Sequence, residues 1–457
     1  MLFTRVSRAS RPDPTGKLPS GFTLREFFRE WEGNIHTEIT RNCIIALMRA
    51  KDPTRDAYSS QFWLVFTGLM ISSTGTTMIW PFIMIFASEK LALPLAAVTS
   101  LMALNSASSL LSSLLAGGLV DQFGRRSVMV LGLVGAALVY LMYIPATQFW
   151  HFSLLMILAG FFTPLYRVGT DTLLADMVAP EQRAHAYGIF RMGRNIGVAI
   201  GPILGGLVLS KSYTIGLIGA GVTLGVYGLI TYIFVKESRQ PAAIPQRGLL
   251  MDKLLVYRDA LRDRPFLGML GAYTLMEICA ALIWVLLAVY MKQNFGLPEA
   301  RYSVIPTTNA LMVVFLQVFV TRRTSRSTGL RVMPLGAFLY AAAMAVVGLS
   351  NGFWGFWIAM VVLTWGELIT APTATAYVAN LAPVDKRGSY LGLFGLTWYI
   401  AMAIGPLTAG IISDSLGIRW PWFLASLVGL GSVAAFVVFN RRQTARAALP
   451  STETQQQ

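Results

Sequence analysis

Twelve long apolar segments, separated by short polar connections, constrain this chain more than any other feature. About 20 apolar residues let a helix cross the hydrocarbon core of a membrane, where a helix satisfies its own backbone hydrogen bonds. The sequence therefore predicts an all-α polytopic membrane protein with twelve transmembrane helices. The segments lie near residues 61–87, 93–118, 127–145, 152–177, 183–209, 213–235, 265–291, 303–321, 332–349, 353–379, 387–412 and 420–440.

Composition agrees with that prediction. Of the 457 residues, 55% are hydrophobic and 13% are charged, whereas about 25% of the residues in a soluble domain are charged. The net charge is +15, but the basic residues flank apolar segments, which indicates contact with membrane lipids rather than with nucleic acid. The two cysteines and three histidines show neither a disulfide framework nor metal-ligand spacing, so no metal site is expected.

The basic residues also predict the orientation of the chain. Clusters of arginine and lysine recur in alternate connections, whereas the other connections hold isolated charges. Because cytoplasmic loops are enriched in basic residues, both termini are expected on the cytoplasmic side of the inner (plasma) membrane, as an even number of spans requires. The clusters are Arg125 and Arg126, Arg183, the 236–264 connection, Arg322, Arg323 and Arg326, Lys386 and Arg387, and Arg441 and Arg442.

The two halves of the chain repeat each other. Ala179-Pro180 matches Ala382-Pro383, and the AIGP sequence at 199–202 recurs at 403–406, with an offset of 203 and then 204 residues. A repeat of six spans in the same orientation predicts a parallel duplication. The expected domains are a cytoplasmic N-terminal extension (1–60), a six-helix bundle (61–235), a cytoplasmic linker (236–264), a second six-helix bundle (265–440) and a cytoplasmic tail (441–457).

A charged turn, GGLVDQFGRR, joins the second and third spans. It resembles the loop 2–3 signature of the major facilitator superfamily, G-x-L-x-D-R-x-G-R-R, with Gln122 in place of an arginine. The resemblance implies two six-helix bundles around a central cavity, working by alternating access. It also implies that an acid at the end of the fourth span, Asp176, contacts the arginine of the turn, so we expect an inner-gate latch. The residues of this gating motif are Gly117, Asp121, Gly124, Arg125, Arg126 and Asp176.

Ionisable residues inside spans are costly and therefore need a reason. Arg167 and Asp171 lie four residues apart on the fourth span, on one helix face, and are predicted to pair. The pair has either a structural role or a role in gating. Arg191 and Arg194, on the fifth span, can neutralise Asp171 or Asp176 and so leave little net buried charge.

Two carboxyl groups have no basic residue near them on their own helices. Glu277 lies on the seventh span and Glu367 on the tenth. A carboxyl group in an apolar wall holds a proton more readily, and can exchange that proton for a cationic partner. The alternative is a protonated carboxyl that a neighbouring helix satisfies. The Gly366-Glu367 pair, followed by Pro372, resembles the tenth span of bacterial multidrug transporters of the same superfamily, where such a glutamate takes part in cation recognition or proton coupling.

The fifth span carries a run of small residues and proline, G-x-x-x-G-P-x-x-G-G. Small residues allow close helix contact, and proline bends a helix. The run resembles the antiporter signature of drug–proton antiporters, although it is also compatible with a simple packing seam. The residues of this antiporter-like motif are Gly197, Gly201, Pro202, Gly205 and Gly206.

These features together predict a secondary transporter that exports lipophilic or cationic drugs in exchange for protons. No ATP-binding signature is present, so the proton gradient is the expected energy source, without a cofactor. The expected partners are a small-molecule substrate, protons and membrane lipids. The alternatives are export of an endogenous metabolite (a sugar, peptide or lipid-like molecule) and a non-transporting membrane sensor on the same fold. No arrangement of nucleophile and base suggests an enzyme.

Overall fold

The computed structural model describes residues 58–179, 182–237, 258, 260–324, 329–383 and 386–447. By its contacts the chain divides into two units, Met1–Ser59 and Ser60–Gln457, and the architecture described below belongs to the second. Most of the predicted N-terminal extension, of the 236–264 linker and of the C-terminal tail lies outside the described residues.

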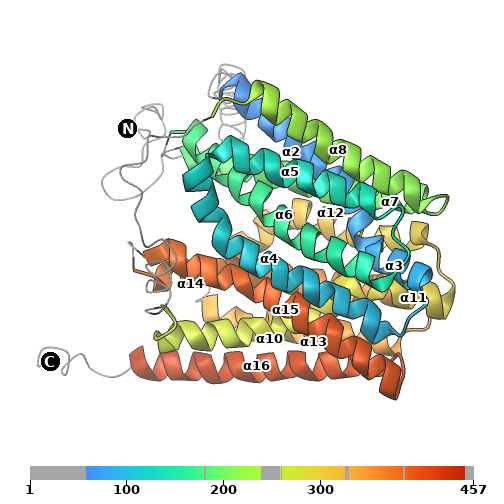
Figure 1. Ribbon diagram of the computed structural model, residues 1–457. Coiled ribbons are helices and arrows are strands. Elements are labelled where there is room, and N and C mark those ends of the chain that lie inside the picture. Colours follow the sequence, from blue (N-terminus) through green and yellow to red (C-terminus); the bar gives the residue numbers. More distant parts are fainter. Residues whose placement is uncertain are drawn as a thin grey trace, which may run out of the picture. The chain divides into compact units, whose positions relative to one another are not determined.

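The prediction of twelve spans is confirmed: among the described residues, twelve helices are long and apolar enough to cross a membrane. Most helices of the first half lie above α10, α13, α14, α15 and α16 of the second half in Figure 1, whereas α12 is drawn beside α6 and α7. Their bounds are α2 Ser60–Ile79, η2 Trp80–Phe82 and α3 Ile83–Leu91 (together one span), α4 Leu95–Phe123, α5 Arg125–Met142, α6 Phe149–Met177, α7 Arg183–Leu209, α8 Tyr213–Phe234, α10 Arg264–Val285, α11 Leu287–Phe295, α12 Glu299–Thr324, α13 Gly329–Leu349, α14 Phe353–Leu381, α15 Arg387–Leu416 and α16 Trp420–Ala447.

The first and seventh spans, predicted as continuous helices, are each interrupted. In the first span Pro81, at the start of η2, cannot donate a backbone hydrogen bond, and the helix tightens there. The segment predicted as the seventh span (265–291) is divided at Leu286 into α10, which is the membrane-length helix, and α11, which follows that span. Both segments then end in a left-handed residue, Ala92 with a φ of 49° and Gly296 with a φ of 60°, and these residues are 204 apart. The interruption therefore belongs to the repeat.

The two halves meet along two seams that are copies of each other. In one seam α7 packs against α12, and in the other α15 packs against α4. Gly206 lies against Ala300 and Ser303, whereas Gly410 lies against Ala96 and Thr99. The corresponding residues of the two seams are each 204 residues apart: Gly206 and Gly410, Ala300 and Ala96, and Ser303 and Thr99. Small residues let the backbones approach closely at both seams, as expected for a parallel repeat.

Candidate functional site

The charged turn between α4 and α5 forms the contact that the sequence predicts. Gly124, between the two helices, has a φ of 94°, which favours glycine. The Arg125 side chain donates to the Asp176 carboxylate at 3.0 Å and lies 4.0 Å from Asp121. Gly117 is half-buried on α4, one turn before Asp121. All these residues belong to the first half, and the end of the bundle that they occupy is called the motif end below.

Glu237, just after α8, is a member of this cluster that the sequence analysis missed. Its carboxylate accepts hydrogen bonds from the backbone N–H groups of Arg125 at 2.9 Å and Arg126 at 3.4 Å, and so caps α5 from the segment that follows α8. The Arg126 guanidinium donates to the Tyr232 carbonyl and lies 5.0 Å from the centre of the Tyr232 ring. A side chain at position 124 would collide with Glu237, so the glycine also makes room for this cap. The sequence feature that could have predicted this contact is an acidic residue shortly after the sixth span.

Asp171 pairs with a different arginine from the one its spacing suggests. Arg194 on α7 lies 3.6 Å from Asp171, and the Tyr187 hydroxyl donates to the Asp171 carbonyl at 2.7 Å. The prediction that an arginine of the fifth span can neutralise Asp171 is thus confirmed, whereas the ion pair predicted between Arg167 and Asp171 is not formed. Arg167 and Arg191 are exposed, and within the described part of the chain neither makes an ion pair or a side-chain hydrogen bond.

The carboxyl groups of the second half lie on neighbouring helices. Glu277 on α10 is 7% exposed. Glu367 on α14 accepts a hydrogen bond from the Asn309 side-chain amide of α12 at 2.7 Å. The two carboxyl groups interact electrostatically with each other, and Glu367 also interacts with Arg191 of the first half.

The antiporter-like motif of α7 contacts two different helices. Gly197, Gly201 and Gly205 lie against α2, within the first half, where a methyl group at Gly205 would stand 2.2 Å from the Met78 carbonyl oxygen. Gly206 instead lies against α12 of the second half. Pro202 lies inside α7, between these contacts. The motif is therefore a packing seam that also reaches across the two halves.

The opposite end of the bundle, called the far end, is closed between the halves. Lys292 of α11 forms ion pairs with Glu89 of α3 at 2.5 Å and with Glu299 of α12, and Tyr213 of α8 donates to Glu299 at 2.7 Å. On the other side of the bundle, Asp414 of α15 accepts from the first N–H groups of α4 at 3.1 and 2.8 Å. Burial lowers the pKa of Lys292, but its hydrogen bonds to Glu299 and Glu89 outweigh burial, and the pKa is raised.

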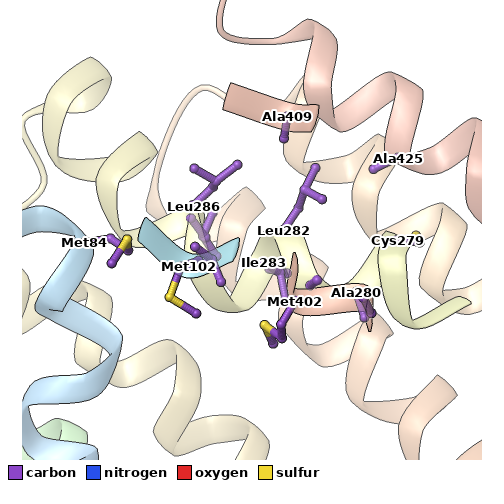
Figure 2. Close-up of a cluster of buried hydrophobic side chains, with 14 of the residues drawn as sticks. Met84, Met102, Cys279, Ala280, Leu282, Ile283, Leu286, Met402, Ala409 and Ala425 are labelled. Atoms are coloured by element: carbon purple, nitrogen blue, oxygen red, sulfur yellow. The ribbon is translucent and has the colours of Figure 1, made fainter. Parts of the chain in front are cut away.

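Apolar side chains from both halves pack together beneath these polar contacts. Met84 of α3 and Met102 of α4 belong to the same buried cluster as Leu282, Leu286 and Met402 of the second half (Figure 2). The structure is thus closed at the far end by apolar packing as well as by ion pairs.

Comparison of the sequence with models of known protein families identifies the family of this chain. The model of the Major Facilitator Superfamily matches residues 65–280 and 269–457. The chain belongs to the major facilitator superfamily. It is therefore a multi-pass membrane protein and a secondary transporter of small molecules, and the family resemblance of the charged turn is confirmed.

Relatives within the superfamily have varied names. A Planococcus maritimus protein named "Na(+), Li(+), K(+)/H(+) antiporter" is 26% identical over 416 residues, covering 83% of this chain and 96% of its own. The Yersinia pestis "Multidrug resistance protein MdtH" is 22% identical over 341 residues, covering 73% and 83%. Among solved structures, a POT family transporter in complex with 5-aminolevulinic acid has a TM-score of 0.71 at 16% identity, covering 84% and 96%. At that identity the structural likeness shows the fold alone.

Proposed function

We propose that this superfamily member exports lipophilic, often cationic compounds in exchange for protons. The observation that carries the proposal is the Glu367 carboxyl, which lies inside a span and accepts a hydrogen bond from Asn309 at 2.7 Å. A carboxyl group in such a place binds either a proton or a cation. Competition between the two for one carboxylate is what exchange requires. The relatives named as an antiporter and as a multidrug resistance protein support the proposal.

The exchange follows from this competition. A cationic substrate entering from the motif end meets the protonated Glu367, displaces its proton and binds the carboxylate. Rearrangement of the two halves then exposes the site at the far end, where protonation of Glu367 releases the substrate. Glu277, which interacts electrostatically with Glu367, stabilises the proton or the cation at this position. By the positive-inside rule the motif end faces the cytoplasm of a plasma-membrane protein, so the far end, where contacts between the halves close the structure, faces the opposite side of the membrane.

Two arginines favour a second candidate, export of a metabolite that carries an acidic group. Arg167 and Arg191 lie inside spans, are exposed, and make no ion pair or side-chain hydrogen bond with a described residue. An arginine in that position binds a carboxylate or a phosphate well.

Transport in inverted membrane vesicles tests the proposal. We expect a proton gradient to drive accumulation of a fluorescent lipophilic cation by the parent protein, and Glu367→Gln to abolish it. Accumulation that Glu367→Gln leaves unchanged would contradict the role of Glu367. If the parent protein accumulates no lipophilic cation, radiolabelled substrates with an acidic group are tested next, and exchange of Na⁺ or K⁺ for protons is measured in the same vesicles.

A further inference from the structure

The two halves carry an asparagine at the same position of the repeat, but use it differently. Asn105 on α4 and Asn309 on α12 are 204 residues apart, and both are buried, at 7% and 5% exposure. The Asn105 amide donates to the Met156 backbone carbonyl at 2.9 Å, which is an ordinary contact between helices. The Asn309 amide donates to the side chains of Thr364 at 3.0 Å and Glu367 at 2.7 Å. Glu367 has no acidic counterpart in the first half, since Thr163 lies 204 residues before it.

The hydrogen bonds around Asn309 fix the direction of its amide. The Thr364 hydroxyl donates its proton to the Met360 carbonyl at 2.7 Å, so its oxygen is left to accept a hydrogen bond. Asn309 must therefore present its NH₂ group to Thr364, and the second N–H of that group points at the Oε2 atom of Glu367. Because Oε2 accepts this hydrogen bond, the exchangeable proton of the carboxyl belongs on Oε1.

The helix that carries Asn309 also contacts the other half of the protein. Two residues before Asn309, the Thr307 hydroxyl donates to the Ala199 carbonyl of α7 at 3.2 Å. One turn earlier, Ser303 lies against Gly206 of the antiporter-like motif. A change in the hydrogen bond between Asn309 and Glu367 is thus felt by the helix that forms one of the two seams.

We propose that Asn309 is the positioning residue of the coupling site: its amide stabilises the ionised Glu367, directs the exchangeable proton to Oε1, and links the state of the carboxyl to the seam between α12 and α7. The inference rests on the proposed function, in which Glu367 exchanges a proton. Asn105, at the equivalent position without an acid, provides a built-in comparison.

The test measures protonation of Glu367 directly and needs no substrate. A hydrophobic carbodiimide reacts with a protonated carboxyl inside a membrane protein, and mass spectrometry of the purified full-length protein gives the labelling of Glu367 as a function of pH. In Asn309→Leu the ionised carboxylate loses a hydrogen-bond donor, so the midpoint of labelling should move upward by about 1 to 2 pH units. Thr364→Val, which keeps Asn309 but removes the oxygen that orients it, should move the midpoint in the same direction by a smaller amount.

The matched control is Asn105→Leu, which removes a buried amide from the equivalent position and should leave the Glu367 midpoint unchanged. A midpoint that does not move in folded Asn309→Leu, or that moves equally in Asn105→Leu, would overturn the proposal. If Asn309→Leu does not fold, Thr364→Val decides by the same criterion. Failure of the proposed function is recognised separately, as vesicles that accumulate no lipophilic cation although labelling of Glu367 responds to Asn309.

Discussion

At the scale of single residues, the charges inside the spans break the symmetry of the repeat. Arg167, Asp171, Arg191 and Arg194 lie in the first half, whereas Glu277 and Glu367 lie in the second. The scaffold of helices and small residues repeats, but the ionisable groups do not. Because the other half packs without these charged side chains, the packing of the fold does not require them. Binding of a substrate or a proton is a better explanation for charged residues inside spans.

The sequence identified these charged residues but not all of their partners. Spacing along one helix suggested Arg167 as the partner of Asp171, whereas the ion pair is with Arg194, one of the two arginines of the fifth span that were also expected to neutralise Asp171 or Asp176. Asn309 was missed because a neutral amide in an apolar helix carries no distinctive signal. The sequence does show that Asn309 and Asn105 occupy equivalent positions of the repeat. The groups that each amide contacts, however, depend on the packing of neighbouring helices.

The cap that Glu237 provides to α5 can be tested by substitution. Glu237→Gln removes the negative charge that accepts from the N–H groups of Arg125 and Arg126, and should destabilise the protein by about 1 kcal/mol. The measurement is the apparent unfolding temperature of purified protein in detergent. The matched control is Lys236→Gln, which removes a charge from the adjacent exposed residue without touching α5. Equal unfolding temperatures for parent and Glu237→Gln would show that the cap contributes nothing to stability.

At the scale of secondary-structure elements, the spans could be predicted closely because lipid imposes both their length and their apolar character. The interruptions at η2 and between α10 and α11 were not predicted, since apolar residues continue across each break. A repeated signal was nevertheless present: LALP at 91–94 and FGLP at 295–298 contain the left-handed residues that end α3 and α11. The small residues of α7 indicated close packing, but did not tell which helix each glycine touches.

Gly206 and Gly410, at equivalent positions of the two seams, give a prediction about the far end. A methyl group at Gly206 would lie 2.6 Å from the Ser303 hydroxyl and 2.9 Å from the Ala300 Cα atom, and one at Gly410 would lie 2.9 Å from the Ala96 Cα atom. We expect Gly206→Ala and Gly410→Ala to loosen the far end, whereas Gly431→Ala, with nothing within 4 Å, should not.

The effect of these glycine variants is measured as the rate at which a cysteine placed at one buried position reacts with a thiol reagent. Met102 is 2% exposed and lies in the apolar cluster shared by the two halves (Figure 2). Met102→Cys, in a background with Cys43→Ser and Cys279→Ala, should react faster with a membrane-impermeant thiol reagent when either seam is loosened. Unchanged reactivity in both seam variants would show that these contacts do not hold the far end closed.

At the scale of the whole molecule, the far end joins the two halves by charge as well as by apolar packing. Glu299 is 5% exposed and depends on Lys292 for its charge partner. Lys292→Met leaves Glu299 uncompensated, so we expect the far end to open more often and Met102→Cys to react about tenfold faster or more. Combining Lys292→Met with Glu299→Gln should restore slow labelling. A single variant that labels at the parent rate would contradict a role for the ion pair in closure.

The same ion pair gives a pH dependence whose sign follows from the pKa of Lys292. That pKa is raised in the folded protein, so the pair contributes its full stability below the ordinary lysine value of about 10.4 and loses it as the pH rises through the folded-state pKa. Lys292 should therefore stay protonated and paired between pH 6 and about pH 9. Over this range the labelling rate of Met102→Cys, corrected for the pH dependence of a free thiol's reactivity, should stay constant. An increase in labelling of the parent between pH 6 and about pH 9, with no such pH dependence in Lys292→Met, would contradict this sign.

Exchange of a proton for a cation at one carboxyl is the central claim, and proton release on binding tests it most directly. Purified protein in a weakly buffered solution is mixed with a lipophilic cation, and the change in pH is recorded for the parent and for Glu367→Gln. We predict release of protons by the parent at a pH where Glu367 is protonated, and no release by Glu367→Gln, although both proteins are folded. Binding of the cation without proton release, or with proton uptake, would contradict competition at Glu367.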